Sequence, residues 1–344
     1  MKQNKKEKDP RLGIVGGQAV LEGVMMKCGD RTALAVRDEN GAIRLDAQQY
    51  VSLRKRHKLL GLPLIRGVVN FAESMILSYK TLMKSADMLG IDFEEDESRF
   101  EKWLREKMGD KMMAILMGIA SVLGVALAMV LFMFLPSLVT SWIDGWIPGG
   151  IGWGRNVLEG VMKIAIFVAY ICLCSLMKEM RRVFEYHGAE HKSIACYEAG
   201  LELTPENAAS CTRFHPRCGT SFIFVILILS ILVNSVLPWD NLFFRSGGKL
   251  LLLPLIVGLG FEFLMYAGKH TNPVTRILSA PGLWMQRITT REPDKSQLEV
   301  AIAALKHAMP EEFPVTVNAE AENTTAEQAS AEAQPESDAA DDAH

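Results

Sequence analysis

Two histidines and a glutamate stand close together in the segment Glu185–Lys192. His187 and His191 are four residues apart, and Glu190 lies between them. If the segment is helical, as its Ala, Glu and Lys content indicates, this spacing places all three side chains on one face. Two imidazoles and a carboxylate on one face can hold a metal ion, so this segment is the first candidate for chemistry.

A second group of metal-ligating residue types follows about thirty residues downstream, in the sequence His215-Pro216-Arg217-Cys218-Gly219. Two ligands three residues apart around a proline-containing turn are typical of a zinc knuckle, although knuckles usually carry Cys at both positions. With the two upstream histidines, the set has four nitrogen and sulfur ligands, the number and type that zinc prefers. We therefore predict a site for zinc or another divalent transition metal, with His187, His191, His215 and Cys218 as ligands.

The coordination number separates two roles for this metal. The order His-x-x-Glu-His matches a pattern of zinc peptidases, in which the glutamate activates water, so Glu190 is the predicted catalytic residue. In those enzymes a glutamate far downstream is the third ligand, and Glu262 stands 71 residues after His191. If all four predicted ligands bind, coordination is closed and the metal is structural. The sequence leaves both roles open.

Long apolar runs must position these residues, and the run 112–143 contains no charged residue. A helix that crosses a bilayer needs about 20 apolar residues, so this run is the clearest predicted span. Further spans are expected at 157–177, 219–237 and 250–267. The predicted fold is therefore mainly α-helical with about four membrane spans, and the metal-ligating residues lie between the second and third spans.

Lys and Arg residues gather on one side of the predicted spans. Many precede residue 112 and six lie between the second and third spans, whereas the two other connecting loops hold three in all. By the positive-inside rule, the loop 178–218 and both termini are cytoplasmic, in a multi-pass protein of the inner (plasma) membrane. The predicted metal site then faces the cytoplasm.

The net charge of the chain is −3, but it is unevenly distributed. The tail 320–344 contains eight acidic residues and no Lys or Arg, so residues 1–319 carry +5. A mildly basic membrane protein suits an anionic lipid surface, and this charge does not indicate nucleic-acid binding. The lipid bilayer is the one partner that the sequence predicts.

The segments outside the predicted spans carry patterns of their own. Glycines indicate tight turns or close backbone approach in residues 12–27. Alternating residues on either side of Asn40-Gly41 predict a hairpin, so a small β-element should precede the membrane helices. Residues 59–89 have helical apolar spacing interrupted by charges, which favours an amphipathic helix at the membrane surface over a helix in a soluble core.

Glycine, proline and capping signals predict further helix boundaries. We expect the second span to continue as a helix to about residue 199, where Gly200 stops it. Pro281 should begin a short amphipathic segment, and Asp294 should cap a helix that ends near Met309.

These patterns divide the chain into five regions. They are an N-terminal cytoplasmic β-element at 1–53, an amphipathic and charged helical region at 54–111, a membrane domain at 112–268 with the cytoplasmic loop 178–218, C-terminal cytoplasmic helices at 269–313, and a disordered acidic tail at 314–344. The tail is too poor in apolar residues to form a packed core.

Three motifs, taken in order, resemble one known family. They are Gly16-Gly17-Gln18-Ala19-Val20-Leu21-Glu22-Gly23-Val24-Met25-Met26, Tyr186-His187-Gly188-Ala189-Glu190-His191-Lys192 and His215-Pro216-Arg217-Cys218-Gly219-Thr220-Ser221-Phe222. Over about residues 12–308 the chain resembles the YqhQ-type bacterial membrane proteins, a family of unknown function often labelled predicted metal-dependent enzymes. The resemblance implies a multi-span protein of the bacterial inner membrane with a metal, and no particular reaction.

Two functions remain open at this point. The first is a metal-dependent hydrolase that acts on a membrane-associated peptide or lipid-linked substrate, with Glu190 as general base. The second is a non-enzymatic scaffold or accessory factor for membrane-protein or envelope biogenesis, in which the metal is structural. A transporter is disfavoured because Glu262 is the only carboxylate in the three clearer spans. The sequence assigns no role to Glu22, and it does not name a substrate or a protein partner.

Overall fold

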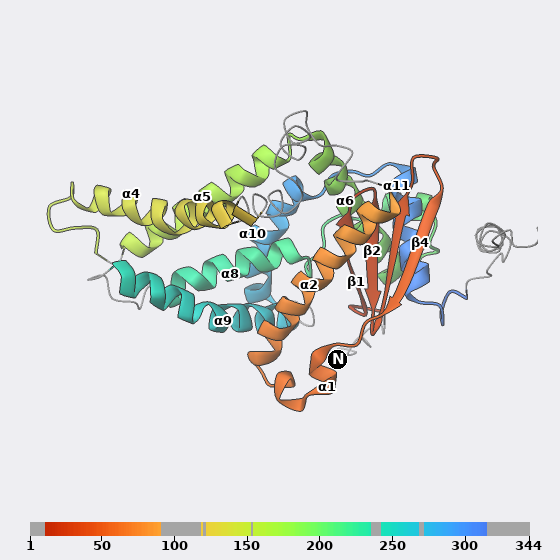
Figure 1. The fold of residues 1–344 in the computed structure, drawn as a ribbon, viewed down its shortest axis with the longest axis horizontal. Coiled ribbons are helices and arrows are strands. Elements are labelled where there is room, and N and C mark those ends of the chain that lie inside the picture. Colours follow the sequence, from red (N-terminus) through yellow and green to blue (C-terminus); the bar gives the residue numbers. More distant parts are fainter. Residues whose placement is uncertain are drawn as a thin grey trace, which may run out of the picture.

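The structure is a computed structural model that describes residues 11–90, 118–119, 122–152, 154–234, 242–267 and 272–314. The charged part of the predicted region 54–111 beyond residue 90 lies outside the described residues, and so does the predicted acidic tail after residue 314. The described residues form a bundle of apolar helices and, beside it, a small sheet packed between helices (Figure 1). The predicted mainly α-helical fold with an N-terminal β-element is confirmed.

The elements follow one another along the chain in an order that separates the sheet from the apolar helices. Their bounds are β1 Val15–Val20, β2 Gly23–Cys28, β3 Arg31–Arg37, β4 Ile43–Gln49, α1 Leu53–Arg56, η1 Lys58–Gly61, α2 Ile65–Met88, η2 Val130–Phe134, α4 Leu135–Asp144, α5 Gly154–Cys174, α6 Lys178–Glu198, α7 Pro205–Ser210, α8 Gly219–Asn234, α9 Leu242–Ala267, α10 Pro273–Thr289 and α11 Lys295–Ala308. The two ends of the described chain are in contact, since the C-terminal helix α11 packs on strands β2 and β3 of the N-terminal sheet (Figure 1).

The sheet has four antiparallel strands in the order β1-β2-β3-β4. The hairpin predicted around Asn40-Gly41 is confirmed as the turn between β3 and β4, where Arg37 pairs with Ile43. The glycine-rich segment forms a second hairpin, in which Val20 pairs with Gly23. Consecutive antiparallel hairpins need only short connections, so the whole sheet forms from local sequence.

Helices cover both faces of this sheet. On one face, α6 and α11 form a core with the strands that includes Met26, Tyr186 and Leu298. On the other face, α2 packs against Met25 and Leu34 of the sheet. Because side chains alternate along a strand, neighbouring residues such as Met25 and Met26 enter different cores.

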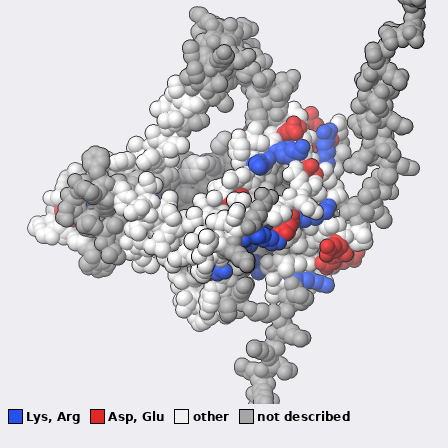
Figure 2. Space-filling view, turned by 60° about the horizontal axis from the view of Figure 1, so that its bottom comes forward, with Lys and Arg blue, Asp and Glu red and all other residues white. Residues whose placement is uncertain are grey.

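Three described helices are long and apolar enough to cross a membrane, and they are Val122–Asp144, Gly154–Cys174 and Gly247–Ala267. They correspond to the first, second and fourth predicted spans. The third predicted span, 219–237, forms the shorter apolar helix α8, and residues 235–237 lie outside the described residues. Figure 2 shows that the charged side chains gather at the sheet end of the molecule, whereas the apolar helices present a mostly uncharged surface.

The sequence predicts one continuous helix from the second span to residue 199, and this prediction is wrong. α5 ends at Cys174 and α6 begins at Lys178. The Ser175 hydroxyl donates to a backbone carbonyl of α5, and the carbonyl of Ser175 accepts a hydrogen bond from Arg291. This tertiary contact holds the chain in a turn, after which α6 ends as predicted before Gly200, whose φ is 69°.

The two predictions for the C-terminal helices have opposite outcomes. Asp294 caps α11 as predicted, through a capping box with Gln297. Pro281 does not begin a helix but lies inside α10, which starts eight residues earlier after the capping box of Asn272 and Thr275. A strong cap upstream therefore outweighs the helix-starting preference of the proline.

Helix α2 connects the sheet to the apolar helices. Its first half crosses α9 at Gly67, where an added Cβ would lie 2.9 Å from the Cα of Gly258. Beside this crossing, the Arg66 guanidinium donates hydrogen bonds of 2.7 and 2.5 Å to the carboxylate of Glu262. Bidentate pairs of this kind are the stronger ion pairs, and Glu262 is therefore part of the helix junction.

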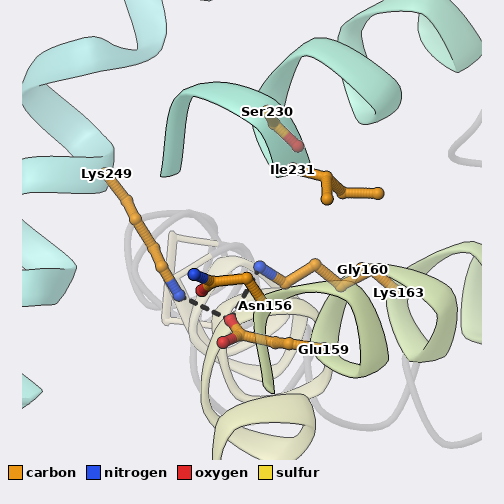
Figure 3. Close-up of a pocket in the computed structure, with 7 residues that line it drawn as sticks. All are labelled: Asn156, Glu159, Gly160, Lys163, Ser230, Ile231 and Lys249. Carbon is orange, nitrogen blue, oxygen red and sulfur yellow. Dashed lines mark hydrogen bonds and ion pairs between the residues drawn. The ribbon is translucent and has the colours of Figure 1, made fainter. Parts of the chain in front are cut away.

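A second group of charges joins the apolar helices to one another (Figure 3). Glu159 of α5 is 2% exposed and lies 2.9 Å from Lys163 of the same helix. Lys249 of α9 approaches the same carboxylate oxygen to 2.5 Å. The cavity beside them has a volume of about 10 Å³, which is about the space that one water molecule needs. We therefore interpret this cluster as a contact between helices rather than as a binding site.

The close crossing of α2 and α9 predicts that Gly258→Val destabilises the protein. A Cβ at this position would lie 2.8 Å from the carbonyl oxygen of Leu64, and overpacking of this kind costs about 1–3 kcal/mol. Thermal unfolding of the purified protein in detergent should therefore occur at a temperature lower by a few degrees.

Gly247→Val is the matched control on the same helix, since nothing in the described residues lies within 4 Å of a Cβ at that position. It should leave the unfolding temperature nearly unchanged. Equal shifts for the two variants would contradict the importance of the crossing.

Candidate metal centre

The two histidines lie together on one face of α6, as their spacing predicts, and their ring centroids are 4.4 Å apart. Cys218 directly precedes α8, and its Sγ lies 3.3 Å from Nε2 of His187. One ligand atom from each of His187, His191 and Cys218 lies within 4.8 Å of the other two. Two imidazole nitrogens and a sulfur at this spacing can surround one zinc-sized ion.

Backbone carbonyls hold both imidazole rings. Nδ1 of His187 lies 2.8 Å from the carbonyl oxygen of Thr289, the last residue of α10. Nδ1 of His191 lies 2.6 Å from the carbonyl oxygen of Arg213. A carbonyl only accepts hydrogen bonds, so each neutral ring carries its proton on Nδ1 and keeps the Nε2 lone pair for a ligand bond. Metal-binding histidines are oriented in this way, and the donor set therefore fits a divalent transition metal.

A buried glutamine holds the turn that presents Cys218. The side chain of Gln286 is fully buried in α10. Its Oε1 accepts a hydrogen bond of 2.8 Å from the backbone N–H of His215, and its Nε2 donates one of 2.8 Å to the carbonyl of His215. The turn continues with a hydrogen bond from the N–H of Cys218 to the same carbonyl. The Cys218 sulfur also lies 3.2 Å from the Thr220 hydroxyl.

His215, the fourth predicted ligand, does not belong to the group that the structure brings together. Its Nε2 lies 3.2 Å from the Arg217 guanidinium and 3.7 Å from the Glu198 carboxylate. The ring itself is close, with its centroid 5.6 Å from that of His191. Among the described residues, three of the four predicted ligands therefore converge.

Glu190 is buried beside the two histidines and is 4% exposed. The backbone N–H of Gly17 in β1 hydrogen-bonds its carboxyl group, whereas its Oε2 has no hydrogen-bond partner within the described part of the chain. Burial raises the pKa of Glu190 to about 7, against the opposing effects of His187 and of the Gly17 hydrogen bond. A carboxyl group with a pKa near neutrality can both take up and release a proton.

Glu22 fastens strand β1 to the helix that carries the histidines. Its carboxylate pairs with the Arg182 guanidinium and accepts a hydrogen bond of 3.3 Å from the Tyr186 hydroxyl. At the other end of β1, the backbone N–H of Gly13 donates to Glu198 at a distance of 2.9 Å. Glu22 therefore has a positioning role. Glu262 pairs with Arg66 of α2 and is not among the grouped ligand residues.

Sequence reasoning missed the groups that hold the site in place. Lys192 is 4% exposed, and its Nζ donates to the carbonyls of Ala209 and Cys211, next to the loop that orients His191. Gln286 and the carbonyl of Thr289 come from α10, about a hundred residues after α6. Backbone carbonyls carry no sequence signal, and a single Gln in an amphipathic helix resembles a solvated residue.

The chain is similar over most of its length to proteins whose function is not established. The family described as "Protein of unknown function (DUF1385)" matches residues 62–311. The chain belongs to this family. It is also 31% identical over 300 residues to the "Uncharacterized protein YqhQ" of Bacillus subtilis (strain 168), an alignment that covers 86% of this chain and 92% of the relative. The resemblance inferred from the three motifs is confirmed, and no solved structure matches the chain.

The geometry predicts which variants lose the metal. Purified full-length protein should contain one divalent metal ion per chain, and His187→Ala, His191→Ala and Cys218→Ala should lose it because each removes one of three ligands. Metal content is measured by elemental mass spectrometry. His215→Ala is the matched control and should keep the metal, since its Nε2 faces Glu198 and Arg217. Loss of metal from folded His215→Ala would instead support the closed four-ligand site.

The backbone contact between α6 and α10 predicts a second effect on the metal. A Cβ at Gly188 would lie 2.0 Å from the carbonyl oxygen of Arg291, two residues after the carbonyl that orients His187. Gly188→Ala should therefore displace this support and weaken metal binding roughly 10–100-fold, as loss of an outer contact usually does. Competition with a chelator measures the affinity. Gly61→Ala, which meets nothing described within 4 Å, should have no effect.

Proposed function

We propose that this protein is a membrane-embedded, metal-dependent hydrolase with its site on the cytoplasmic face. His187, His191 and Cys218 hold zinc or another divalent transition metal, and Glu190 is the general base. The observation that carries the proposal is the convergence of three ligand atoms next to a buried carboxylate that has one unpartnered oxygen. Three protein ligands leave a position for substrate or water, as in catalytic zinc sites.

The residues of the site have distinct tasks in this proposal. When bound, the metal supplies a Lewis acid that polarises the substrate and lowers the pKa of water. Glu190 takes the proton of the attacking water and returns it to the leaving group, while the N–H of Gly17 holds its carboxyl group in place. The carbonyls of Thr289 and Arg213 keep both imidazoles in the tautomer that ligates through Nε2.

Exposed apolar surfaces on α2 and α10 support a membrane-associated substrate. The exposed apolar residues of α2 are Ile65, Phe71, Met75, Ile76, Tyr79, Leu82 and Met83, and those of α10 are Val274, Ile277 and Trp284. Apolar helix faces of this kind suit a lipid interface. With the three long apolar helices and the distribution of Lys and Arg, they support four spans, cytoplasmic termini and the bilayer as a partner.

The second candidate function is a non-enzymatic scaffold or accessory factor for membrane-protein or envelope biogenesis. One observation favours it: the ligands come from α6, which packs on the sheet, and from the residue before α8, which belongs to the apolar bundle. A metal bound there joins the two parts of the molecule. In this function the metal is structural and Glu190 has no chemical role.

Glu190→Gln separates the two functions. The substitution keeps the size of the side chain but removes the base, so hydrolysis should fall by about 10²–10⁴-fold while metal content stays unchanged. The assay is cleavage of a library of quenched fluorescent peptides by metal-loaded protein in lipid nanodiscs. Glu202→Gln, at an exposed position, is the control and should retain full activity. Undiminished cleavage by Glu190→Gln, or none by the wild type, would argue against the hydrolase.

A further inference from the structure

Helix α10 crosses the apolar bundle at the end of the bundle that is nearer the sheet (Figure 1). It begins shortly after α9 ends at Ala267, and α9 contains one of the described helices that are long and apolar enough to cross a membrane. At Gly282 it packs on the first turn of α8, because an added Cβ there would lie 2.5 Å from the Cα of Ser221. The helix therefore lies where the apolar helices end, at the level of a bilayer surface.

Four exposed residues give α10 an outer side with two different borders. They are Arg276, Ile277, Trp284 and Arg287. With about 3.6 residues per turn, the two arginines stand almost above one another, whereas Ile277 and Trp284 are displaced together to one side. The outer side thus has a basic border and an apolar border, and Ile277 is 70% exposed and Trp284 53% exposed.

No described residue neutralises the basic border. α10 contains no Asp or Glu. Within the described residues, neither guanidinium of α10 has a hydrogen bond or an ion pair, whereas Arg66 and Arg182 each pair with a carboxylate. Arg287 stands in the last turn, where the helix dipole favours a positive charge, but Arg276 stands in the first turn, where the dipole opposes one. Both arginines are therefore available to a negative group from another molecule.

We propose that α10 binds anionic phospholipids along this outer side. The lipid phosphates pair with Arg276 and Arg287, and the acyl chains lie against Ile277 and Trp284. Arginine matches the geometry of a phosphate group, and tryptophan favours the interface between water and lipid. A basic border beside an apolar border is the arrangement of a helix that lies in a membrane surface. An acidic protein would match the arginines but not the apolar border, which continues the apolar bundle.

The inner side of the same helix supports the candidate metal centre. Gln286 bonds both backbone groups of His215, and the carbonyl of Thr289 holds the ring of His187. Arg287 stands between these two residues of α10 in the sequence. A lipid that fixes α10 at the bilayer surface therefore also fixes these supports, and metal should bind more tightly when the lipid is present. The lipid site rests on the proposed membrane embedding, but it needs neither metal nor hydrolysis.

Trp284 provides a direct test, because bromine atoms on a lipid chain quench a tryptophan that they contact. The full-length, metal-free protein is placed in phosphatidylcholine nanodiscs that contain a minor fraction of brominated phosphatidylglycerol, or an equal fraction of brominated phosphatidylcholine. The chain has six tryptophans, so the signal of Trp284 is the difference between the protein with this residue and its Trp284→Phe variant. Stronger quenching by the anionic lipid measures its enrichment at α10.

The decisive variant is Arg276→Gln/Arg287→Gln, and its matched control is Lys295→Gln/Lys306→Gln on α11. Both variants remove two positive charges, but α11 packs on the sheet and not on the apolar bundle. In the wild type and the control, the anionic lipid should be enriched roughly fivefold for each arginine of α10. The arginine variant should lose this enrichment and be quenched equally by the two lipids. Inorganic phosphate added to the solution should not displace the lipid.

Three results would overturn the lipid site. They are equal quenching of the wild type by the two lipids, an enrichment that the arginine variant retains, and a loss that the lysine control shares. Displacement by inorganic phosphate would also overturn it, because the arginines would then bind a soluble anion. None of these results bears on the hydrolase, which is tested by cleavage.

The effect on the metal is measured separately, by competition with a chelator in the same two kinds of nanodisc without bromine. Wild-type protein should bind the metal about fivefold more tightly with phosphatidylglycerol than without it. The arginine variant should show no such difference, and this comparison removes the effect of the anionic surface on the free metal and the chelator. An equal difference in both proteins would remove the coupling and keep the lipid site.

Discussion

A run of buried polar residues in α6 is the constraint on which the rest of the structure depends. Glu190, His191 and Lys192 are consecutive residues, and each is at most 4% exposed. Burying such groups without partners costs several kcal/mol each, so other elements must supply hydrogen bonds to them. Those partners come from β1, from α7 and the loop that follows it, and from Glu292 after α10. These buried polar residues thereby join elements that are far apart in the sequence.

This arrangement places the candidate metal centre where the sheet meets the apolar helices. α10 is the link, because its Gln286 holds the turn before Cys218 and the carbonyl of its last residue holds a histidine. Movement of the apolar bundle against the sheet would change the distance between Cys218 and α6. Because the ligands come from both parts of the molecule, a metal bound here would also join those parts, and this fits a structural role as well as a catalytic one.

Three carboxylates illustrate how pairing separates structural from chemical roles. Glu22 and Glu262 both stand in apolar sequence, and each is paired with an arginine that neutralises it and anchors a helix or hairpin. Glu190 is more deeply buried and has one oxygen without a partner in the described structure. A buried, incompletely satisfied carboxyl group is costly to keep, and such groups are concentrated at functional sites.

The sequence by itself determined the features that depend on local spacing. The four-residue step between His187 and His191 predicts a shared helix face, Asn40-Gly41 predicts a hairpin, and long uncharged runs predict apolar helices. Only the tertiary structure decided which ligands converge and where α5 ends. The turn His215–Cys218 turns its sulfur toward the histidines and its imidazole toward Glu198 and Arg217. That choice depends on a glutamine 71 residues away, and no local spacing encodes such a contact.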